Sequence, residues 1–500
     1  MASTLKSCCS GIPQRWIFVL MGFLALFTAY AMRVCLSIAV TQMVVPIEET
    51  KEYLDDTCPT FEDEAPANST AFKGGTFEWS EYTQGLILSS FYWGYVITHF
   101  PSALVAEKFG GKYTLGFGIL FAGILTIVSP YVVYWGDATA FIIVRTLLGV
   151  FCGCMYPASN VMLSQWIPLS ERSKAGSMVF AGGPLGTVFA TSVSGLILEY
   201  SSIGWPAVFY FFGGCGVVWF IVFMLICYNN PVEHPFISDN ELKFLQEELS
   251  EHKHDDTPPV PWKEILTSKP VWALTVASFG NGWGFATLIS DLNKYMSSVL
   301  KFSIQDNGYL SSLPFLCMWF GSIISSWISD WLIVKDKMSA TNVRKWGTTI
   351  ASVGPALCLI GASYAGCNRV VVVTMITLGM TLLGSSLPSI KVNVLDLSPN
   401  YAGSLMALTN VFAAGTGMVT PSIVGLLTPH QTLEEWRLVF WTIFGVFLGT
   451  NVIFVMYASG DVQEWNDPQY LRKLRESKKK PKINEEVELL PVTKSEKEHK

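Results

Sequence analysis

Two arginines lie inside stretches of the chain that are otherwise apolar. Arg33 interrupts residues 16–40, and Arg145 interrupts the run FIIVRTLLGVFCGCMYPA. A charged side chain in the hydrocarbon core of a membrane costs at least ~2.5–3.5 kcal/mol, so such residues usually face a protein interior or a watery solute path. A guanidinium offers a planar fork of donors that matches a carboxylate or a phosphate. The two residues therefore predict an anion-binding cavity; the alternative is that each pairs with a buried acid and only holds helices together.

The composition indicates that these arginines belong to an all-α membrane protein. Half of the 500 residues are hydrophobic and only 14% are charged, against about a quarter in soluble domains. Apolar runs of ~20 residues, long enough to cross a bilayer, predict twelve transmembrane helices. The expected spans are 16–40, 83–105, 113–134, 138–162, 176–200, 205–228, 270–291, 307–332, 346–366, 370–393, 402–427 and 436–458.

The basic residues orient these spans. They concentrate before the first span, in alternate loops and after Arg472, and the positive-inside rule assigns such segments to the cytosol. Both termini are thus expected in the cytosol. The external loop 41–80 contains Asn68 in an Asn-x-Ser/Thr acceptor, which predicts glycosylation. We therefore expect five parts: a cytosolic N-terminus (1–15), a first six-helix half (16–228), a cytosolic linker (229–269), a second six-helix half (270–458) and a cytosolic tail (459–500).

The two arginines are expected at the same depth. Each lies about seven residues inside the outer end of its helix, which at 1.5 Å per residue places both side chains ~10 Å below the outer surface. Two six-helix halves joined by a polar linker predict a pseudo-twofold transporter with its site between the halves near mid-membrane. The anion site is therefore expected at this height.

A weak repeat relates the two halves. Residues 103–112 follow the second span and residues 321–330 close the eighth, and each stretch places an acid, Glu107 or Asp330, at the cytosolic end of its helix. Such an acid could hold a neighbouring helix end in one conformation and release it in another. Both residues are candidates for conformational gating, and the alternative is that each is an exposed helix cap.

Several motifs together resemble a known family. They are Tyr30–Val40 in the first span, Trp79–Phe91 leading into the second, Lys301–Pro314 leading into the eighth, and Asn393–Asp396 with the closing segment 457–465. The stretches at 103–112 and 321–330 look like the loop motif of the major facilitator superfamily. The combination resembles the anion/cation symporter family, which contains sialin, the vesicular glutamate transporters and the sodium–phosphate cotransporters. The resemblance covers roughly residues 16–466.

The resemblance implies a function as well as a fold. Arg33 and Arg145 match the two arginines that this family uses on its anionic substrate. We expect a secondary active transporter that moves a small organic anion by alternating access, with H⁺ as the coupling ion. One alternative is a sodium-coupled inorganic phosphate cotransporter, and a second is a non-transporting anion sensor on the same fold.

Two departures from the family pattern bear on coupling and substrate. Cys152 stands where the family often has a proton-coupling glutamate, and a thiol with a pKa near 8.5 is a poor substitute. His99 in the second span titrates in the right range and is the other coupling candidate, although a buried histidine is more often a helix contact. Asn281 stands where the glutamate transporters have a further arginine, which makes a dicarboxylate substrate less favourable.

Other residues could complete the cavity. Tyr30 and Tyr95 lie near the depth of Arg33, and Asn393 lies in the tenth span; each could equally be a packing residue. Lys391 also interrupts the tenth span, where we expect its side chain to snorkel toward the cytosolic surface; the alternative is a cationic contact at the inner mouth. Cys58 and Cys367 are both expected outside, and the sequence leaves their pairing open.

The remaining signals concern chemistry and location. The chain has no Gly-rich phosphate loop, metal-ligand spacing or paired intramembrane carboxylates, so we expect no enzyme activity, cofactor, metal or nucleic-acid partner. Besides its anion, the protein is expected to contact membrane lipids. Glu485, Leu489 and Leu490 fit an acidic dileucine signal for a clathrin adaptor. The sequence therefore favours a multi-pass protein of the plasma membrane or of a lysosomal or vesicular membrane.

Overall fold

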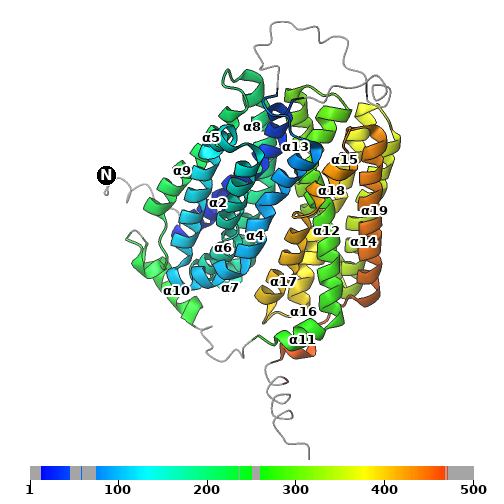
Figure 1. The fold of residues 1–500 in the computed structure, drawn as a ribbon. Coiled ribbons are helices and arrows are strands. Elements are labelled where there is room, and N and C mark those ends of the chain that lie inside the picture. Colours follow the sequence, from blue (N-terminus) through cyan, green and yellow to red (C-terminus); the bar gives the residue numbers. More distant parts are fainter. Residues whose placement is uncertain are drawn as a thin grey trace, which may run out of the picture.

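The computed structural model describes residues 13–45, 58, 75–235, 237–250, 260–467 and 470, and most of them are helical. Figure 1 shows the helices in two groups, one up to α9 and one from α12 onward. The predicted acceptor Asn68 and the predicted signal at Glu485, Leu489 and Leu490 lie outside the described residues. Those two predictions therefore stay predictions.

The first group contains the helices that carry both arginines. Arg33 lies on the first long helix and Arg145 on the second part of α5. Ser80 caps α4, because its side chain accepts a hydrogen bond from the backbone N–H of Thr83, as Ser does at helix starts. The helices are α2 (Gln14–Met43), α4 (Glu81–Phe109), α5 (Gly111–Cys152), α6 (Met155–Trp166), α7 (Leu169–Phe180), α8 (Gly182–Tyr200) and α9 (Pro206–Ile226).

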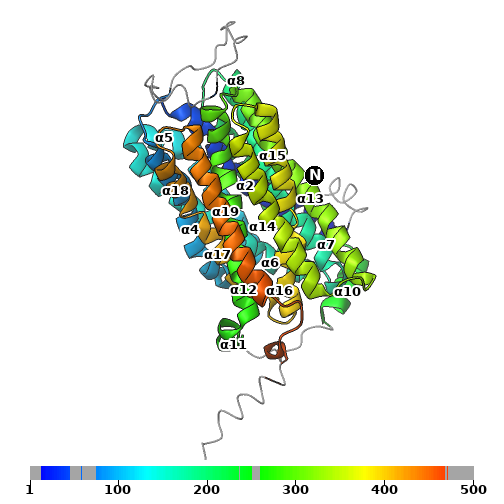
Figure 2. The same cartoon turned by 90° about the vertical axis from the view of Figure 1, so that its right-hand side faces the viewer.

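The second group has the same kind of architecture. Its last helix begins with a capping box, in which the side chains of Thr432 and Glu435 each accept a backbone N–H of the other residue, so two donors at the helix start are satisfied. The helices are α12 (Lys269–Lys294), α13 (Ile304–Val334), α14 (Ala340–Tyr364), α15 (Arg369–Leu383), α16 (Val392–Leu397), α17 (Ala402–Thr416), α18 (Thr420–Leu427) and α19 (Leu433–Tyr457). Seen from the side, α14, α15 and α19 lie next to one another (Figure 2).

A break divides α5 where the sequence predicts one span to end and the next to begin. Gly136 and Asp137 have non-helical backbone angles, and Asp137 has a φ of 51°. The Asp137 carboxylate also accepts a hydrogen bond from the indole of Trp79 at 2.6 Å. The 42 residues of α5 therefore form two helical segments that meet at this turn.

Nine stretches of the described residues are long and apolar enough to cross a membrane. One of them, Gly111–Trp166, contains 56 residues and includes the break at Gly136. The helices α4 and α12, of 29 and 26 residues, are not among the nine, although they match the expected second and seventh spans. The structure thus supports a helical membrane protein, and the count of twelve spans stays a prediction.

The two groups are joined mainly at one end. We call the end that contains Met43, Glu81 and Lys294 the outer side, following the sequence prediction, and the opposite end the linker side. Across the groups α13 packs on α8, α4 on α17 and α18, and α2 on α12. Near the outer side, a Cβ added at Gly308 of α13 would lie 3.0 Å from the Cα of Gly195 in α8. The ribbons of the two groups diverge toward the linker side (Figure 1).

A disulfide also joins the groups at the outer side. Cys58, from the loop that follows α2, is bonded to Cys367, from the connection between α14 and α15. The backbone N–H of Cys58 donates to the carbonyl of Val299 at 3.2 Å. The pairing that the sequence leaves open is therefore formed, and it ties the first outer loop to the second group.

The linker contributes the helices α10 (Asp239–Ser250) and α11 (Trp262–Thr267). The first of these helices is largely polar, and its Leu245 is buried. Arg15, at the start of α2, pairs with Glu241 of α10 at 3.4 Å and with Glu171 of α7 at 2.9 Å. These ion pairs fix α10 to the linker side of the first group.

Candidate anion site

The structure brings Arg33 and Arg145 together. Arg33 lies on α2 and Arg145 on the second segment of α5, and Nη2 of Arg145 donates to the backbone carbonyl of Arg33 at 3.1 Å. The two helical segments are antiparallel, and this contact places the two side chains at one level. The depth expected from the sequence agrees with this contact.

Aromatic rings surround the two guanidinium groups. Nη2 of Arg33 donates to the hydroxyl of Tyr92, and its guanidinium lies 4.5 Å from the ring centre of Tyr92, 5.1 Å from that of Phe91 and 5.3 Å from that of Tyr30. The guanidinium of Arg145 lies 5.6 Å from the centre of the Phe91 ring. Aromatic faces attract cations, so these rings stabilise the charges without neutralising them.

Neither guanidinium is paired with an acid among the described residues. The ion pairs found among the described residues involve other basic side chains, so neither Arg33 nor Arg145 is paired with a carboxylate there. Arg145 is only 2% exposed, and its Nε has no hydrogen-bond partner in the described part of the chain. A buried donor without an acceptor is costly, and a bound anion would supply the acceptor. The alternative that each arginine pairs with a buried acid is not what the described residues show.

A small cavity opens between these side chains and the second half. Residues Ile289 and Ser290 of α12 form its wall on that side, so both halves contribute to it. Its lining residues are Arg33, Val34, Ser37, Leu88, Phe91, Tyr92, Arg145, Ile289 and Ser290. The cavity lies between the halves, as expected for a transporter site.

Tyr30 and Tyr95 both lie beside the arginines. The hydroxyls of Tyr30 and Tyr156 are 3.0 Å apart, and Tyr30 contributes a ring face to Arg33. Tyr95 packs between Phe91 and His99, with ring centres 5.8 and 5.5 Å away. Tyr30 therefore contacts Arg33 directly. Tyr95 instead contacts Phe91, the ring that lies against both arginines.

The two coupling candidates are buried on neighbouring helices. His99 in α4 is 7% exposed and its Nδ1 has no hydrogen-bond partner among the described residues. Cys152, at the end of α5, is 3% exposed. Both belong to the first half, on the linker side of the arginines along their helices. The coupling role of both residues stays a prediction.

Lys391 is oriented differently from the sequence expectation. It ends the π-helical turn Leu387–Lys391 between α15 and α16, and its amine donates to the side-chain carbonyl of Asn410 in α17. It also lies close enough to His99, in the other half, to interact with it electrostatically. The amine therefore turns toward the space between the halves, which favours the alternative of a cationic contact at the inner mouth over snorkelling.

The two asparagines lie in the second half, away from the arginine cavity. Neither Asn281 of α12 nor Asn393 of α16 lines that cavity. Asn393 is fully buried and both polar atoms of its side chain have no partner in the described part of the chain, and the same holds for Nδ2 of Asn281. Their amides are free for a ligand or water, but the structure does not bring them to Arg33 and Arg145.

The gating candidates occupy the expected helix ends. Glu107 lies in the last turns of α4, and its side chain is outside the described residues. Asp330 is exposed near the end of α13. Exposure agrees with a helix cap as well as with a gate, so the gating role of both acids stays a prediction.

Sequence reasoning missed a polar cluster at the outer side. Lys294, the last residue of α12, forms an ion pair at 2.6 Å with Glu81, the first residue of α4. Asp291 lies one helical turn before Lys294 and is 1% exposed. The sequence placed these acids at span ends, where charged residues are ordinary. The spacing of Asp291 and Lys294 on one helix face was the available signal.

Comparison with known proteins identifies the family of the chain. The Major Facilitator Superfamily pattern matches residues 22–421. Human sialin is 39% identical over 477 residues, which cover 93% of this chain and 92% of sialin. A Drosophila ananassae protein named as a candidate inorganic phosphate cotransporter is 37% identical, over 90% of this chain and 93% of the relative. Vesicular glutamate transporter 1 of Xenopus laevis is 33% identical, over 92% and 77%.

Solved structures show the same fold. The inward-open xylose transporter XylE from E. coli matches with a TM-score of 0.65 at 11% identity, over 92% of this chain and 99% of XylE. A bacterial homologue of the human lysosomal transporter Spinster, in an inward-facing unoccupied conformation, matches with a TM-score of 0.61 at 13% identity, over 92% and 98%. The chain belongs to the major facilitator superfamily of membrane transporters, in the group that contains sialin, the vesicular glutamate transporters and the inorganic phosphate cotransporters, and it is not an enzyme.

Proposed function

We propose that the protein moves small organic monoanions across a membrane by alternating access, with H⁺ as the coupling ion. The observation that carries this proposal is the pair Arg33 and Arg145. Both guanidinium groups line one cavity between the halves, without a carboxylate partner among the described residues. An uncompensated cation inside a membrane protein is expensive, and a bound anion removes that expense.

The relatives narrow the choice of anionic substrate. Sialin and the vesicular glutamate transporters are 39% and 33% identical to this chain. Asn281 replaces the further arginine of the glutamate transporters, and Asn281 does not reach the arginine cavity. Two guanidinium groups suffice for one carboxylate, so a monoanion such as a sugar acid or an aromatic carboxylate fits better than a dicarboxylate.

Inorganic phosphate is the second candidate. It rests on the relatives of Drosophila ananassae and Drosophila melanogaster, at 37% and 36% identity, that are named as candidate inorganic phosphate cotransporters. Guanidinium groups bind phosphate as well as carboxylate. This candidate differs from the first in a measurable way, because it calls for Na⁺ as the coupling ion.

The arrangement of the halves supports alternating access. The outer side is closed by the ion pair Glu81–Lys294, by the 3.0 Å contact of Ser89 with Ser422, and by the bond from Asn293 to Ser37 at 2.7 Å. The ribbons diverge toward the linker side (Figure 1). The protein in this conformation is closed outward, and the opposite conformation requires these contacts to separate.

Coupling to a cation follows from the charge of the substrate. An anion that enters against a negative potential loses ~2.3 kcal/mol per charge for each 100 mV. A proton that travels with a monoanion cancels this charge. His99 and Cys152 are the positions that the sequence offers for that proton, and His99, with its free Nδ1, is the better of the two.

Flux in reconstituted liposomes tests the proposal. The purified protein is tested with glucuronate, benzoate, glutamate and phosphate under an H⁺ gradient and, separately, under a Na⁺ gradient. We expect H⁺-driven uptake of an organic monoanion. Phosphate uptake that needs Na⁺ would support the second candidate, and anion binding without flux would identify a sensor. A preference for neutral or cationic solutes would contradict both transport proposals.

A further inference from the structure

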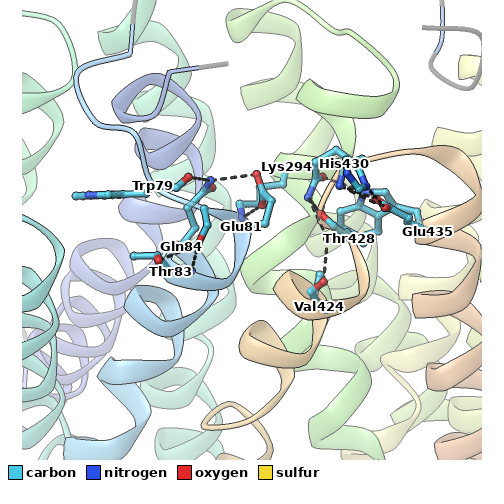
Figure 3. A network of polar contacts seen from close by, with 12 residues as sticks. Trp79, Glu81, Thr83, Gln84, Lys294, Val424, Thr428, His430 and Glu435 are labelled. Atoms are coloured by element: carbon cyan, nitrogen blue, oxygen red, sulfur yellow. Dashed lines mark hydrogen bonds and ion pairs between the residues drawn. The ribbon is translucent and has the colours of Figure 1, made fainter. Parts of the chain in front are cut away.

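An ion pair between the two halves closes the outer side. Nζ of Lys294 lies 2.6 Å from Oε2 of Glu81, and their side chains are 6% and 9% exposed. The other carboxylate oxygen of Glu81 accepts a hydrogen bond from Nε2 of Gln84 at 3.0 Å, and Gln84 also donates to the carbonyl of Trp79. Figure 3 shows Glu81 and Lys294 pointing toward one another from α4 and α12. This pair can exist only while the two halves touch at the outer side.

A second carboxyl group lies next to this pair. Asp291 is 1% exposed, and its Oδ2 has no hydrogen-bond partner in the described part of the chain. It interacts electrostatically with Lys294 and with Glu81. Glu81 forms the ion pair with Lys294, and among the described residues Asp291 forms none with it. Burial disfavours the charged form of a carboxyl group, and the nearby carboxylate of Glu81 adds to this effect, so the closed arrangement favours a proton on Asp291.

Asp291 is also adjacent to the anion cavity. Ile289 and Ser290, directly before it in α12, line the cavity together with Arg33 and Arg145. Asn293, two residues after it, donates to Ser37, which also lines that cavity. Asp291 therefore lies between the anion site and the outer ion pair, where one group can respond to both.

We propose that Asp291 takes up the proton that travels with the anion, and that the Glu81–Lys294 pair forms when this proton is bound. The inference rests on the proposed H⁺-coupled anion transport. With the outer side open, Glu81 moves away and Lys294 pairs with the Asp291 carboxylate one turn before it. A proton from the outer solution then adds to Asp291 and frees Lys294 for Glu81, so the outer side closes. The proton leaves Asp291 for water in the cavity once the linker side is open.

The surroundings of Asp291 define which groups can influence it. Lys294 lies on its own helix and Glu81 comes from α4. The connection between α18 and α19 contributes His430, which pairs at 3.0 Å with Glu435 in the first turn of α19 (Figure 3). The nearby contributions of α2 and α13 are the neutral Ser37 and Asn307, both bonded to Asn293. With Asp291 as the proton carrier, one proton and one monoanion cross the membrane together in each cycle. The cycle therefore transfers no net charge.

Two assays on Asp291→Asn in reconstituted liposomes test this inference with radiolabelled glucuronate. The first measures uptake driven by an H⁺ gradient, with a trapped pH dye to follow the proton. The second measures counterflow, the exchange of labelled for unlabelled glucuronate at equal pH. We expect driven uptake to fall about tenfold or more, because an amide cannot carry the proton, while counterflow stays within about twofold of the wild type. Asp291→Glu should restore driven uptake.

The control is Glu78→Gln, which removes an exposed acid on the same side of the protein and should change neither assay. Driven uptake that survives in Asp291→Asn would overturn the inference while leaving anion transport intact. Loss of counterflow in a variant that elutes as a folded protein would overturn it too, because Asp291 would then be needed for anion movement itself. His99→Gln with full loss of driven uptake, beside an unaffected Asp291→Asn, would assign the proton to His99. A wild type that moves neither glucuronate nor benzoate would reject the proposed function first; if only benzoate is moved, labelled benzoate replaces glucuronate in both assays.

Discussion

At the scale of single residues, the unusual feature is a buried positive charge that no carboxylate of the described residues balances. Arg145 is buried, contacts the backbone of Arg33 and keeps one donor without an acceptor in the described part of the chain. Protein interiors rarely leave such donors unused. In the proposed function, a bound anion would complete the hydrogen bonding of the site, and the strength of its binding should follow the geometry of the guanidinium fork.

Arg145→Ala should nearly abolish anion uptake. Removing one partner of a buried charged contact costs about 2–5 kcal/mol, which weakens binding by about thirtyfold or more. Arg145→Lys should also impair uptake, because an ammonium group is a point charge without the planar fork. Initial uptake rates in liposomes measure both effects. Arg437→Ala, which removes an arginine over the Tyr364 ring instead of one in the cavity, is the control, and normal uptake by Arg145→Ala would reject the site.

The arginines could be predicted because a charge in an apolar run is visible in the sequence. Tyr30 could be predicted as a neighbour of Arg33, because it lies on the same helix at a similar depth. The contacts that come from other helices could not be predicted. Tyr92 is one of many aromatic residues until α2 and α4 pack and bring its hydroxyl to Arg33. Glu81 and Lys294 are 213 residues apart, and each looks like an ordinary charge at a helix end. Contacts between helices depend on how the helices pack, which a single sequence does not contain.

At the scale of helices, close approach depends on residues without side chains. A Cβ added at Gly149 of α5 would collide with the backbone carbonyl oxygen of Phe91 in α4. Gly149 lies one turn after Arg145, and Phe91 is the ring over which both guanidinium groups lie. The same glycine therefore sets the helix spacing and the position of the cationic site.

Gly149→Ala should destabilise the protein and reduce anion uptake. Overpacking a close contact costs typically about 1–3 kcal/mol, and the displacement moves Arg145 relative to Phe91. The apparent melting temperature in detergent, read from the folded peak in size-exclusion chromatography, measures the first effect. Gly214→Ala is the matched control, because nothing lies within 4 Å of an added Cβ there. Equal melting temperatures for the two variants would show that α4 and α5 can separate freely.

The sequence predicts where a helix ends more readily than whether that helix crosses the membrane. The sequence separates two spans at 134 and 138, and the backbone breaks at Gly136 and Asp137. By contrast, α12 matches the expected span 270–291 but is not among the nine apolar stretches of the described residues, and it carries Asn281, Asp291, Asn293 and Lys294. A turn depends on the residues that form it, so its position can be read from the local sequence. Polar residues that face a partner helix lower the mean hydropathy of their own helix, even when that helix is buried.

At the scale of the whole molecule, the outer side is closed and the halves diverge toward the linker side. The hydroxyl oxygens of Ser89 in α4 and Ser422 in α18 are 3.0 Å apart. They mark a point where the halves must part for the opposite conformation. A covalent link at this point should therefore stop the cycle without touching the anion site.

The double variant Ser89→Cys with Ser422→Cys should lose uptake on oxidation, because a disulfide there holds the outer side closed. Reduction should restore uptake, and the measurement is glucuronate flux before and after each treatment. Each single variant serves as a control and should respond to oxidation like the wild type. Full flux in the cross-linked double variant, with the link verified by mass spectrometry, would show that the outer side does not open there.

The native disulfide gives the chain a connectivity that its order of helices hides. The bond between Cys58 and Cys367 spans 309 residues, and the linker at 229–269 lies within that interval. The covalent backbone from Cys58 to Cys367 is thus a ring that passes through both halves. A single cut in the linker opens the ring without releasing either half, so the two moving bodies of this transporter stay on one covalent molecule even when the segment that connects them is severed.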